Sequence, residues 1–254
     1  RDRSGCRCRL PTVRPLCWPP CCFSSRFVNS NAILMLNEAS ESFPKIARLP
    51  ASLDEAVNAA RLFDSEEITG CRVRRAVFDG CRLTRRFVQS VLFEECTFRD
   101  FRMAESHFTD VVFRNCDLSN DFLSGCNFLR VEFIGCRLIG TDFLQGSFRQ
   151  VGMERCLADY ANFSESRFRQ IRLHTVMCRD AVFANCQLDR ACFERCDFNR
   201  AEFYRTEMKG LDLRNSEIAD LRVTSVGSFE LRGLRVTSLQ ALGLARMLGI
   251  EIED

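Results

Sequence analysis

Large apolar side chains recur at every fifth position over most of the chain. Counting in fives from Val73 to Val223 gives 31 positions, of which 15 are Phe and none is charged or polar. An α-helix favours a spacing near 3.6 residues and a strand a spacing of 2, so neither element alone accounts for the pattern. A fixed short period of this kind is typical of a repeat architecture.

A small or apolar residue precedes each of these central positions by two, as in the stretch AVFANCQLDRACFERCDFNRAEF at residues 181–203. A polar residue usually lies between them, so the three residues predict a short extended segment with its first and third side chains inward. The two residues that remain are often Gly, Ser, Asn, Asp or Arg, which suit a corner. Each pentapeptide is therefore predicted to form one short side and one turn.

A second period, of twenty residues, sets the number of sides in a coil. The inward positions from Val91 to Leu211 at steps of twenty hold Val, Ile, Ala or Leu, and those from Cys96 to Cys196 hold Cys except at Val176. Like residues twenty apart predict four pentapeptides per coil, with successive coils about 4.8 Å apart. The predicted fold is an all-β solenoid with four sides, forming a rod roughly 37 Å long.

These features resemble the pentapeptide repeat proteins, whose repeat is a small residue, then Asp or Asn, then Leu or Phe, then two variable residues. The stretches that match it most closely are ANF at 161–163, CDF at 196–198, CDL at 116–118 and AEF at 201–203. The resemblance covers about residues 70–223. It implies a right-handed quadrilateral β-helix with stacked Phe side chains in its interior.

Two triplets depart from the repeat. Residues 86–88 and 121–123 place a charged residue, Arg86 or Asp121, at a position that should face inward. A lone buried charge would cost several kcal/mol. We therefore expect a local bulge or a slipped corner at both places.

The two ends of a solenoid need covering. The stretch SLDE at 52–55 is a capping box followed by apolar residues at helical spacing, which predicts a short helix over the first coil. A second helix is predicted from Ser238 to Leu248, ending before Gly249. The expected organisation is an upstream segment at 1–34 that is disordered or foreign to the fold, a linker and capping helix at 35–69, the β-helix at 70–228, and a C-terminal cap at 229–254.

The C-terminal segment resembles that of the quinolone-resistance (Qnr-type) pentapeptide repeat proteins, which dimerise end to end through it. The resemblance consists of a pattern of apolar residues and a Leu-Gly-Ile ending. It implies a homodimer formed through Leu239, Leu242, Leu244 and Leu248.

Many of the 16 cysteines occupy small inward positions, where a thiol is most simply a small buried hydrophobe. In-register neighbours about 4.8 Å apart exceed the ~3.5–4.5 Å that two Cβ atoms need for a disulfide. So many unpaired thiols predict a reducing compartment, hence the cytoplasm. The cysteines of the first 34 residues follow no metal-binding spacing.

Catalytic chemistry has no support in the sequence. The two histidines, His107 and His174, fall at outward positions on different sides, and there is no glycine-rich phosphate loop. We expect a non-enzyme that needs neither a metal nor a cofactor.

The resemblance to the Qnr-type group implies a protein partner, DNA gyrase or topoisomerase IV, bound by mimicry of duplex DNA, and in some members a reduced action of fluoroquinolones. Residues 70–223 hold 22 acidic but also 24 basic residues, which argues against mimicry of a whole duplex. One side of the rod, with central positions 78, 98 and onward to 218, carries eight acidic against four basic residues. We call it the acidic side and predict that it contacts the topoisomerase through Asp79, Asp100, Asp117, Asp159, Asp180, Asp197, Glu217 and Asp220.

The alternative is a cytoplasmic protein–protein interaction scaffold without a topoisomerase role. It rests on an outward-facing apolar belt around one coil, formed by Leu129, Ile134, Ile139 and Leu144. Direct nucleic-acid binding ranks last, because the basic side lacks interleaved aromatic residues. No apolar run approaches the ~20 residues of a membrane span, so no membrane partner is expected.

Overall fold

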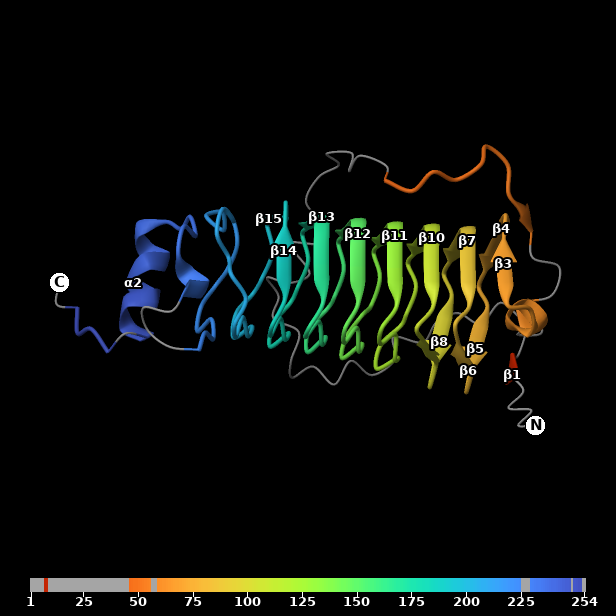
Figure 1. Cartoon of the computed structure of the whole chain (residues 1–254), viewed down its shortest axis with the longest axis horizontal. Helices are drawn as coiled ribbons and strands as arrows, with labels where there is room; N and C mark the ends of the chain where they lie inside the picture. Colours follow the sequence, from red (N-terminus) through yellow and green to blue (C-terminus); the bar gives the residue numbers. More distant parts are fainter. Residues whose placement is uncertain (1–6, 9–45, 56–58, 225–228, 248, 253–254) are drawn as a thin grey trace, which may run out of the picture.

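The computed structural model describes residues 7–8, 46–55, 59–224, 229–247 and 249–252. Figure 1 shows a rod in which short strands stand side by side across the long axis, with a helix at the C-terminal end. The predicted upstream segment falls outside the described residues except for residues 7–8. The fold is the parallel β-solenoid that the five- and twenty-residue periods predict.

The elements follow the repeat closely. The strands are β1 (Arg7–Cys8), β2 (Asp54–Glu55), β3 (Glu67–Thr69), β4 (Cys71–Arg74), β5 (Val77–Asp79), β6 (Arg82–Thr84), β7 (Phe87–Glu94), β8 (Thr97–Arg99), β9 (Arg102–Ala104), β10 (His107–Arg114), β11 (Asn127–Ile134), β12 (Ser147–Glu154), β13 (Arg167–His174), β14 (Gln187–Asp189) and β15 (Cys192–Glu194). The helices of the described residues are the 3₁₀ helices η1 (Ala59–Asp64) and η2 (Phe229–Leu231) and the α-helix α2 (Ser238–Met247).

Strand register confirms four sides per coil. In the largest sheet, Phe113 of β10 aligns with Phe93 of β7 and with Phe133 of β11, each twenty residues away. The strands β7, β10, β11, β12 and β13 each cover two consecutive sides, and the other two sides are joined by short strands and single bridges such as that between Asp197 and Glu217. Side chains twenty residues apart therefore form columns along the rod.

The core is built from stacked phenylalanine rings. The column Phe143, Phe163, Phe183 has ring centroids 5.1 and 4.9 Å apart with nearly parallel planes. Rings of neighbouring columns meet edge to face, as Phe148 meets Phe143 at 5.7 Å. Both arrangements are favoured for aromatic pairs, and they fill the interior as the sequence predicts.

Corner residues adopt the left-handed backbone conformation. Arg85 has a φ of 53° and Asn120 a φ of 61°, a region that non-glycine residues enter at a cost. Coil-to-coil hydrogen bonds offset that cost, because the Arg85 N–H donates to Ala104 O at 3.1 Å and the Asn120 N–H donates to Ile139 O at 2.8 Å.

The small inward residues have a polar function as well as a steric one. Cys136 Sγ, Thr141 Oγ1 and Ser166 Oγ each donate to the carbonyl oxygen 23 residues earlier, at 3.3, 2.8 and 3.1 Å. A small side chain with one donor therefore suits this position. Burial raises the pKa of the thiols of Cys126, Cys186 and Cys196 to about 12, so they stay protonated.

The expectation of unpaired thiols in the core is met by most cysteines of the solenoid and is wrong for one. The free thiols include Cys71, Cys96, Cys116, Cys126, Cys136, Cys156, Cys178, Cys186, Cys192 and Cys196. Cys81 is disulfide-bonded, so the inward position does not by itself protect a thiol from oxidation.

The predicted bulges at Arg86 and Asp121 do not occur. The His107 N–H donates to Arg86 O at 2.8 Å, and the Asp142 N–H donates to Asp121 O at 2.9 Å, so the register continues through both triplets. The Asp121 side chain is fully buried and accepts a hydrogen bond from the Phe101 N–H at 3.0 Å. Its second oxygen has no hydrogen-bond partner, and burial raises the pKa of Asp121 to about 7.

The N-terminal cap differs from the predicted helix. Residues 52–55 are not helical, because Asp54 and Glu55 form β2 and pair with Cys71 and Arg72 of β4. The helical turn comes later, as η1, whose Phe63 packs against Phe78 and Phe101 with ring centroids 4.9 and 5.4 Å away. Phe63 is buried and Leu62 also packs against the core, so η1 contributes to the cover of the first coil.

The C-terminal cap agrees with the sequence. Helix α2 begins at Ser238 behind a capping box, in which Thr237 Oγ1 accepts from the Gln240 N–H and Gln240 Oε1 accepts from the Thr237 N–H. Gln240 Nε2 also donates to Leu213 O and Ser216 O, at 2.9 and 2.7 Å, which fixes the helix on the last coil. No helix among the described residues is long and apolar enough to cross a membrane.

Candidate protein-binding surfaces

The acidic side carries its predicted residues at outward positions, but most of them have partners within the rod. Arg179 Nη2 lies 2.5 Å from Asp159 Oδ2, and Arg200 Nη2 lies 2.7 Å from Asp180 Oδ2. Each arginine sits twenty residues after its carboxylate, one coil further along. The two ion pairs are therefore steps in a column.

The remaining residues of the acidic side divide into paired and unpaired groups. Asp117 lies 3.5 Å from Arg137, and Asp100 lies 3.5 Å from Arg82 and 3.6 Å from Arg102. Asp197 is only 7 % exposed and accepts from the Asn199 N–H at 3.0 Å, and burial raises its pKa. Three of the eight predicted residues of the acidic side are exposed and have no ion pair within the described chain: Asp79, Glu217 and Asp220.

The apolar belt is not a continuous surface. Leu129, Ile134, Ile139 and Leu144 are all half-buried and lie one on each of the four sides. More exposed aromatic residues lie elsewhere: Phe87 is 50 % exposed and stacks on His107, and Arg102 covers the ring of Phe122. A role of the belt in partner binding stays a prediction.

Helix α2 exposes two of the four leucines predicted to form a dimer. Leu239 and Leu242 are 78 % and 42 % exposed. Leu244 is half-buried and packs against the core, and Leu248 lies outside the described residues. End-to-end dimerisation stays a prediction, now centred on Leu239 and Leu242.

An extended segment, residues 46–50, lies along the outside of the rod across β10 and β11 (Figure 1). Glu132 Oε1 accepts from the N–H groups of Ile46 and Ala47, and Asp110 Oδ1 accepts from the Arg48 N–H at 2.9 Å. Both carboxylates are buried, at 5 and 6 % exposure. We call residues 46–50 the docked segment.

Asp110 is held from two directions. Arg130 donates to both of its oxygens, at 2.7 and 2.6 Å. Burial alone would raise the pKa of Asp110, but the hydrogen bonds from Arg130 and from the Arg48 N–H outweigh it and hold that pKa below its usual value. The carboxylate is therefore ionised while it binds the docked segment.

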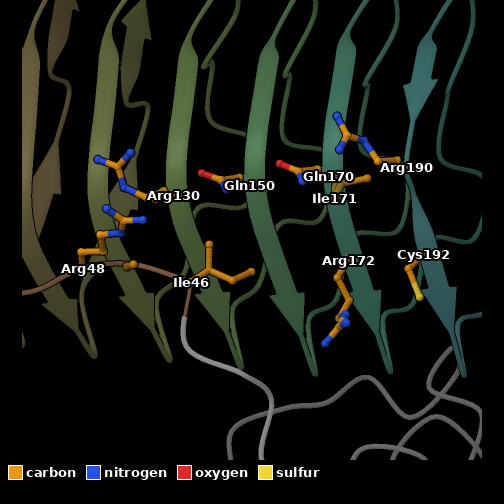
Figure 2. Close-up of a pocket in the computed structure, with 10 residues that line it drawn as sticks. Ile46, Arg48, Arg130, Gln150, Gln170, Ile171, Arg172, Arg190 and Cys192 are labelled. Atoms are coloured by element: carbon orange, nitrogen blue, oxygen red, sulfur yellow. The ribbon is translucent and has the colours of Figure 1, made fainter.

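A groove of about 470 Å³ lies beside residues 46–48 of the docked segment. Figure 2 shows its wall, formed by successive coils, with the docked segment at one side. The described residues that line it include no acidic residue; they are Ile46, Ala47, Arg48, Arg130, Gln150, Gln170, Ile171, Arg172, Arg190 and Cys192. We call this the basic groove.

The described residues contain no group of three or more His, Cys, Asp and Glu side chains placed to hold a metal ion. His107 stacks on Phe87, and His174 Nδ1 lies 3.4 Å from Thr175 Oγ1.

Two family models match the middle of the solenoid. Residues 106–181 match the pentapeptide repeat region, and residues 178–217 match eight copies of the pentapeptide repeat. The two matches together span residues 106–217, less than half of the chain. The solenoid is accordingly called the pentapeptide-repeat solenoid below.

Solved structures with this fold include a trypsin-treated variant of QnrB1, a plasmid-mediated fluoroquinolone resistance protein. It is 22 % identical, with 74 % of this chain and 95 % of that chain covered and a TM-score of 0.47. Full-length QnrB1 is 20 % identical, covering 72 % and 95 %, with a TM-score of 0.42. A pentapeptide repeat protein from the Arabidopsis thaliana thylakoid lumen is 14 % identical, covering 41 % and 68 %, with a TM-score of 0.31. No curated protein sequence matches the chain.

The sequence predicted Asp159 and Asp197 as part of an outward acidic surface, but both are buried, and their pairing with arginines was missed. The twenty-residue offset between Asp159 and Arg179 was available as a signal, since columns join residues that far apart. The roles of Asp110 and Glu132 had no such signal, because the segment that they bind lies 62 to 86 residues away and outside the repeat.

Proposed function

We propose that this chain is a non-catalytic rod that binds another protein through the outer surface of its pentapeptide-repeat solenoid. The observation that carries the proposal is the filled interior: Phe128, Phe143 and Phe163 are at most 2 % exposed. A core packed in this way leaves the outer sides as the surface for recognition. The backbone hydrogen bonds between coils hold those sides rigid, which lowers the entropy cost of binding.

The narrower proposal is that the partner is DNA gyrase or topoisomerase IV and that binding modulates fluoroquinolone sensitivity. The net negative charge of the acidic side favours it. Because Asp159 and Asp180 are neutralised by arginines of the next coil, the contact has to use the unpaired acids. Glu217 and Asp220 lie together near the C-terminal end of the solenoid, and we propose that the topoisomerase binds there.

Gyrase supercoiling with the purified full chain, with and without a fluoroquinolone, tests this proposal. We expect inhibition of supercoiling or relief of drug-induced cleavage. The double variant E217K/D220K should lose the effect. The matched control is E207K, because Glu207 is also exposed and unpaired in the described chain but lies on a different side.

Two outcomes would overturn the narrower proposal. An unmodified chain without effect on gyrase or topoisomerase IV excludes the topoisomerase role and leaves the interaction scaffold. Equal loss in E217K/D220K and E207K would show attraction to charge in general. The free thiols support a reducing compartment such as the cytoplasm as the place where the rod acts.

A further inference from the structure

One face of the largest sheet is open along its length. In β10, β11, β12 and β13 the second residue of each strand, from Phe108 to Phe168, points inward and is buried. The first and third residues therefore point outward, and the parallel register places them in two columns that β14 continues. We call these columns the open face; its residues are all exposed or half-buried, and they are His107, Asn127, Ser147, Arg167 and Gln187 beside Thr109, Leu129, Arg149, Arg169 and Asp189.

The open face is hollowed around Ser147. Three hollows of about 300, 420 and 390 Å³ adjoin there, and Ser147 lines all of them. Arg149 lines the first and second hollows, and Arg167 lines the second and third. These three side chains thus surround a depression that a side chain of another molecule can enter.

Arg149 and Arg167 are exposed, and neither has an ion pair within the described chain. Several other arginines of the rod meet a carboxylate one coil step away, as Arg179 meets Asp159. From these two arginines the same step reaches no acid: it leads to Leu129 and Arg169 from Arg149, and to Ser147 and Gln187 from Arg167. The register that neutralises the acidic side therefore leaves two guanidinium groups available here.

The acids that line these hollows are directed to other groups. Asp189 lies 3.6 Å from Arg169 and 3.5 Å from Arg190. Glu165 stands on the neighbouring corner, where its Oε2 accepts from Gln145 Nε2 at 2.9 Å. Neither carboxylate makes an ion pair with the two available guanidinium groups.

The positive charge of the open face is confined to β12 and β13. The coil before them presents the uncharged Asn127 and Leu129, and the coil after them presents Gln187 and Asp189. Nucleic acid carries a charge at every step along its length, so most of its charges would find no partner here. A single phosphoryl group fits better, because it concentrates about two negative charges and three acceptor oxygens, which guanidinium groups bind in a matching fork geometry.

We propose that the open face binds a phosphorylated segment of the partner protein, with the phosphoryl group held by Arg149, Arg167 and the Ser147 hydroxyl. The inference rests on the proposed protein-binding function and names the partner's chemistry. Ser147 and Arg167 are one coil step apart, about 4.8 Å, and Arg149 lies two residues along the strand from Ser147, about 6.6 Å. Two long arginine side chains at that spacing can reach the same phosphoryl group. The hollow beside Asn127 receives uncharged residues that flank it.

Fluorescence anisotropy with the full chain and pools of fluorescein-labelled heptapeptides tests the proposal. The pools carry phosphoserine, phosphothreonine or phosphotyrosine at the centre and mixed residues elsewhere, and matching pools without the phosphoryl group are the comparison. We expect saturable binding of at least one phosphorylated pool, weakened by added salt because the arginines are exposed. The double variant R149Q/R167Q should bind that pool at least about tenfold more weakly, since it loses two charge-assisted hydrogen-bond donors.

The chain supplies a matched control in R99Q/R195Q. Arg99 holds the same place in its repeat as Arg149, on the acidic side, and Arg195 lies on a corner. Both are exposed, have no ion pair within the described residues and do not line the hollows of the open face. This variant removes the same charge as R149Q/R167Q and should retain phosphopeptide binding within about twofold. Both double variants should keep the melting temperature of the unmodified chain.

Four results would overturn the inference. Absence of binding by every phosphorylated pool would remove the site, and equal loss in the two double variants would show attraction to positive charge in general. Inorganic phosphate that binds as tightly as the peptides would assign the depression to the free anion. A labelled oligothymidylate that binds more tightly and is weakened by R149Q/R167Q would assign the face to nucleic acid. None of these results changes the outcome of the gyrase test with E217K/D220K, so failure of the inference and failure of the topoisomerase proposal are distinguishable.

Discussion

The acidic side and the surface that holds the docked segment both carry buried carboxylates, yet they use them differently. On the acidic side, Asp159 is satisfied by an arginine of the next coil. Beneath the docked segment, Glu132 binds backbone N–H groups of a segment that is not part of the solenoid. A count of charges alone suggests that the carboxylates of the acidic side are available to a binding partner and that the surface under the docked segment has no particular role. The hydrogen bonds reverse that conclusion, because available charge depends on pairing.

The largest effect expected from this comparison is on the free energy of unfolding of the chain, when a paired carboxylate of the acidic side is removed. Replacement of Asp159 by Ala removes the close partner of the half-buried Arg179 guanidinium and leaves it only Asp197, 3.9 Å away. The change should lower the free energy of unfolding by about 2 kcal/mol, the usual loss for a hydrogen bond to a charged group. Replacement of the exposed Asp220 by Ala should change it by less than about 0.5 kcal/mol. Guanidinium chloride unfolding followed by circular dichroism measures both. Similar values for the two variants would contradict the distinction between paired and unpaired acids.

A smaller effect is expected at the buried carboxyl of Asp121. Its second oxygen accepts a hydrogen bond neither from an arginine nor from a backbone N–H group. Because burial raises its folded-state pKa to about 7 from the ordinary 3.8 of an aspartate, the folded chain holds this proton over a pH range in which the unfolded chain has lost it. The group therefore reduces stability progressively from pH 4 to pH 7 and fully above pH 7.

The variant D121N removes that pH dependence. Its melting temperature should exceed that of the unmodified chain by a few degrees at pH 8, since each kcal/mol corresponds to about 2–4 °C in a chain of this size. At pH 4 the difference should nearly vanish. The exposed Asp220→Asn serves as the control, with no difference at either pH. A gain of equal size at both pH values would show that packing, not ionisation, is responsible.

The smallest effect is local, at the docked segment. Glu132→Ala removes the acceptor of the Ile46 and Ala47 N–H groups, and their amide hydrogen exchange should accelerate at least about tenfold. Glu154→Ala is the control, because Glu154 is equally buried, at 6 % against 5 % exposure, but pairs with Arg155. Exchange measured by mass spectrometry should differ only in Glu132→Ala. Unchanged protection there would mean that other contacts hold the segment.

The sequence was sufficient for the interior because periodicity is a property of the whole chain. Phe143 and Phe163 are predicted to stack simply by being twenty residues apart, and they do. The capping box at 52–55 was misleading because it is a local pattern, whereas the residues there pair with the edge of β4. Local propensity carries no information about such a distant partner.

The departures at Arg86 and Asp121 were misjudged for a related reason. A charge at an inward position was weighed against its own burial cost alone. The hydrogen bonds of the neighbouring coils keep the backbone in register whatever the side chain is, and the cost appears as a raised pKa at Asp121 instead of a bulge. The groove beside the docked segment was beyond prediction, because it needs the position of residues 46–50 relative to coils far along the sequence.

Because the register repeats every twenty residues, the rod can change in length without rearranging its sides only by whole coils. Loss or duplication of one whole coil, for example residues 127–146, would shorten or lengthen it by about 4.8 Å and leave every column on its own side. Loss of five residues would instead turn the remaining coils by a quarter and bring the acidic side where a neighbouring side had been. Changes in length that preserve what the surface presents are therefore confined to multiples of twenty residues.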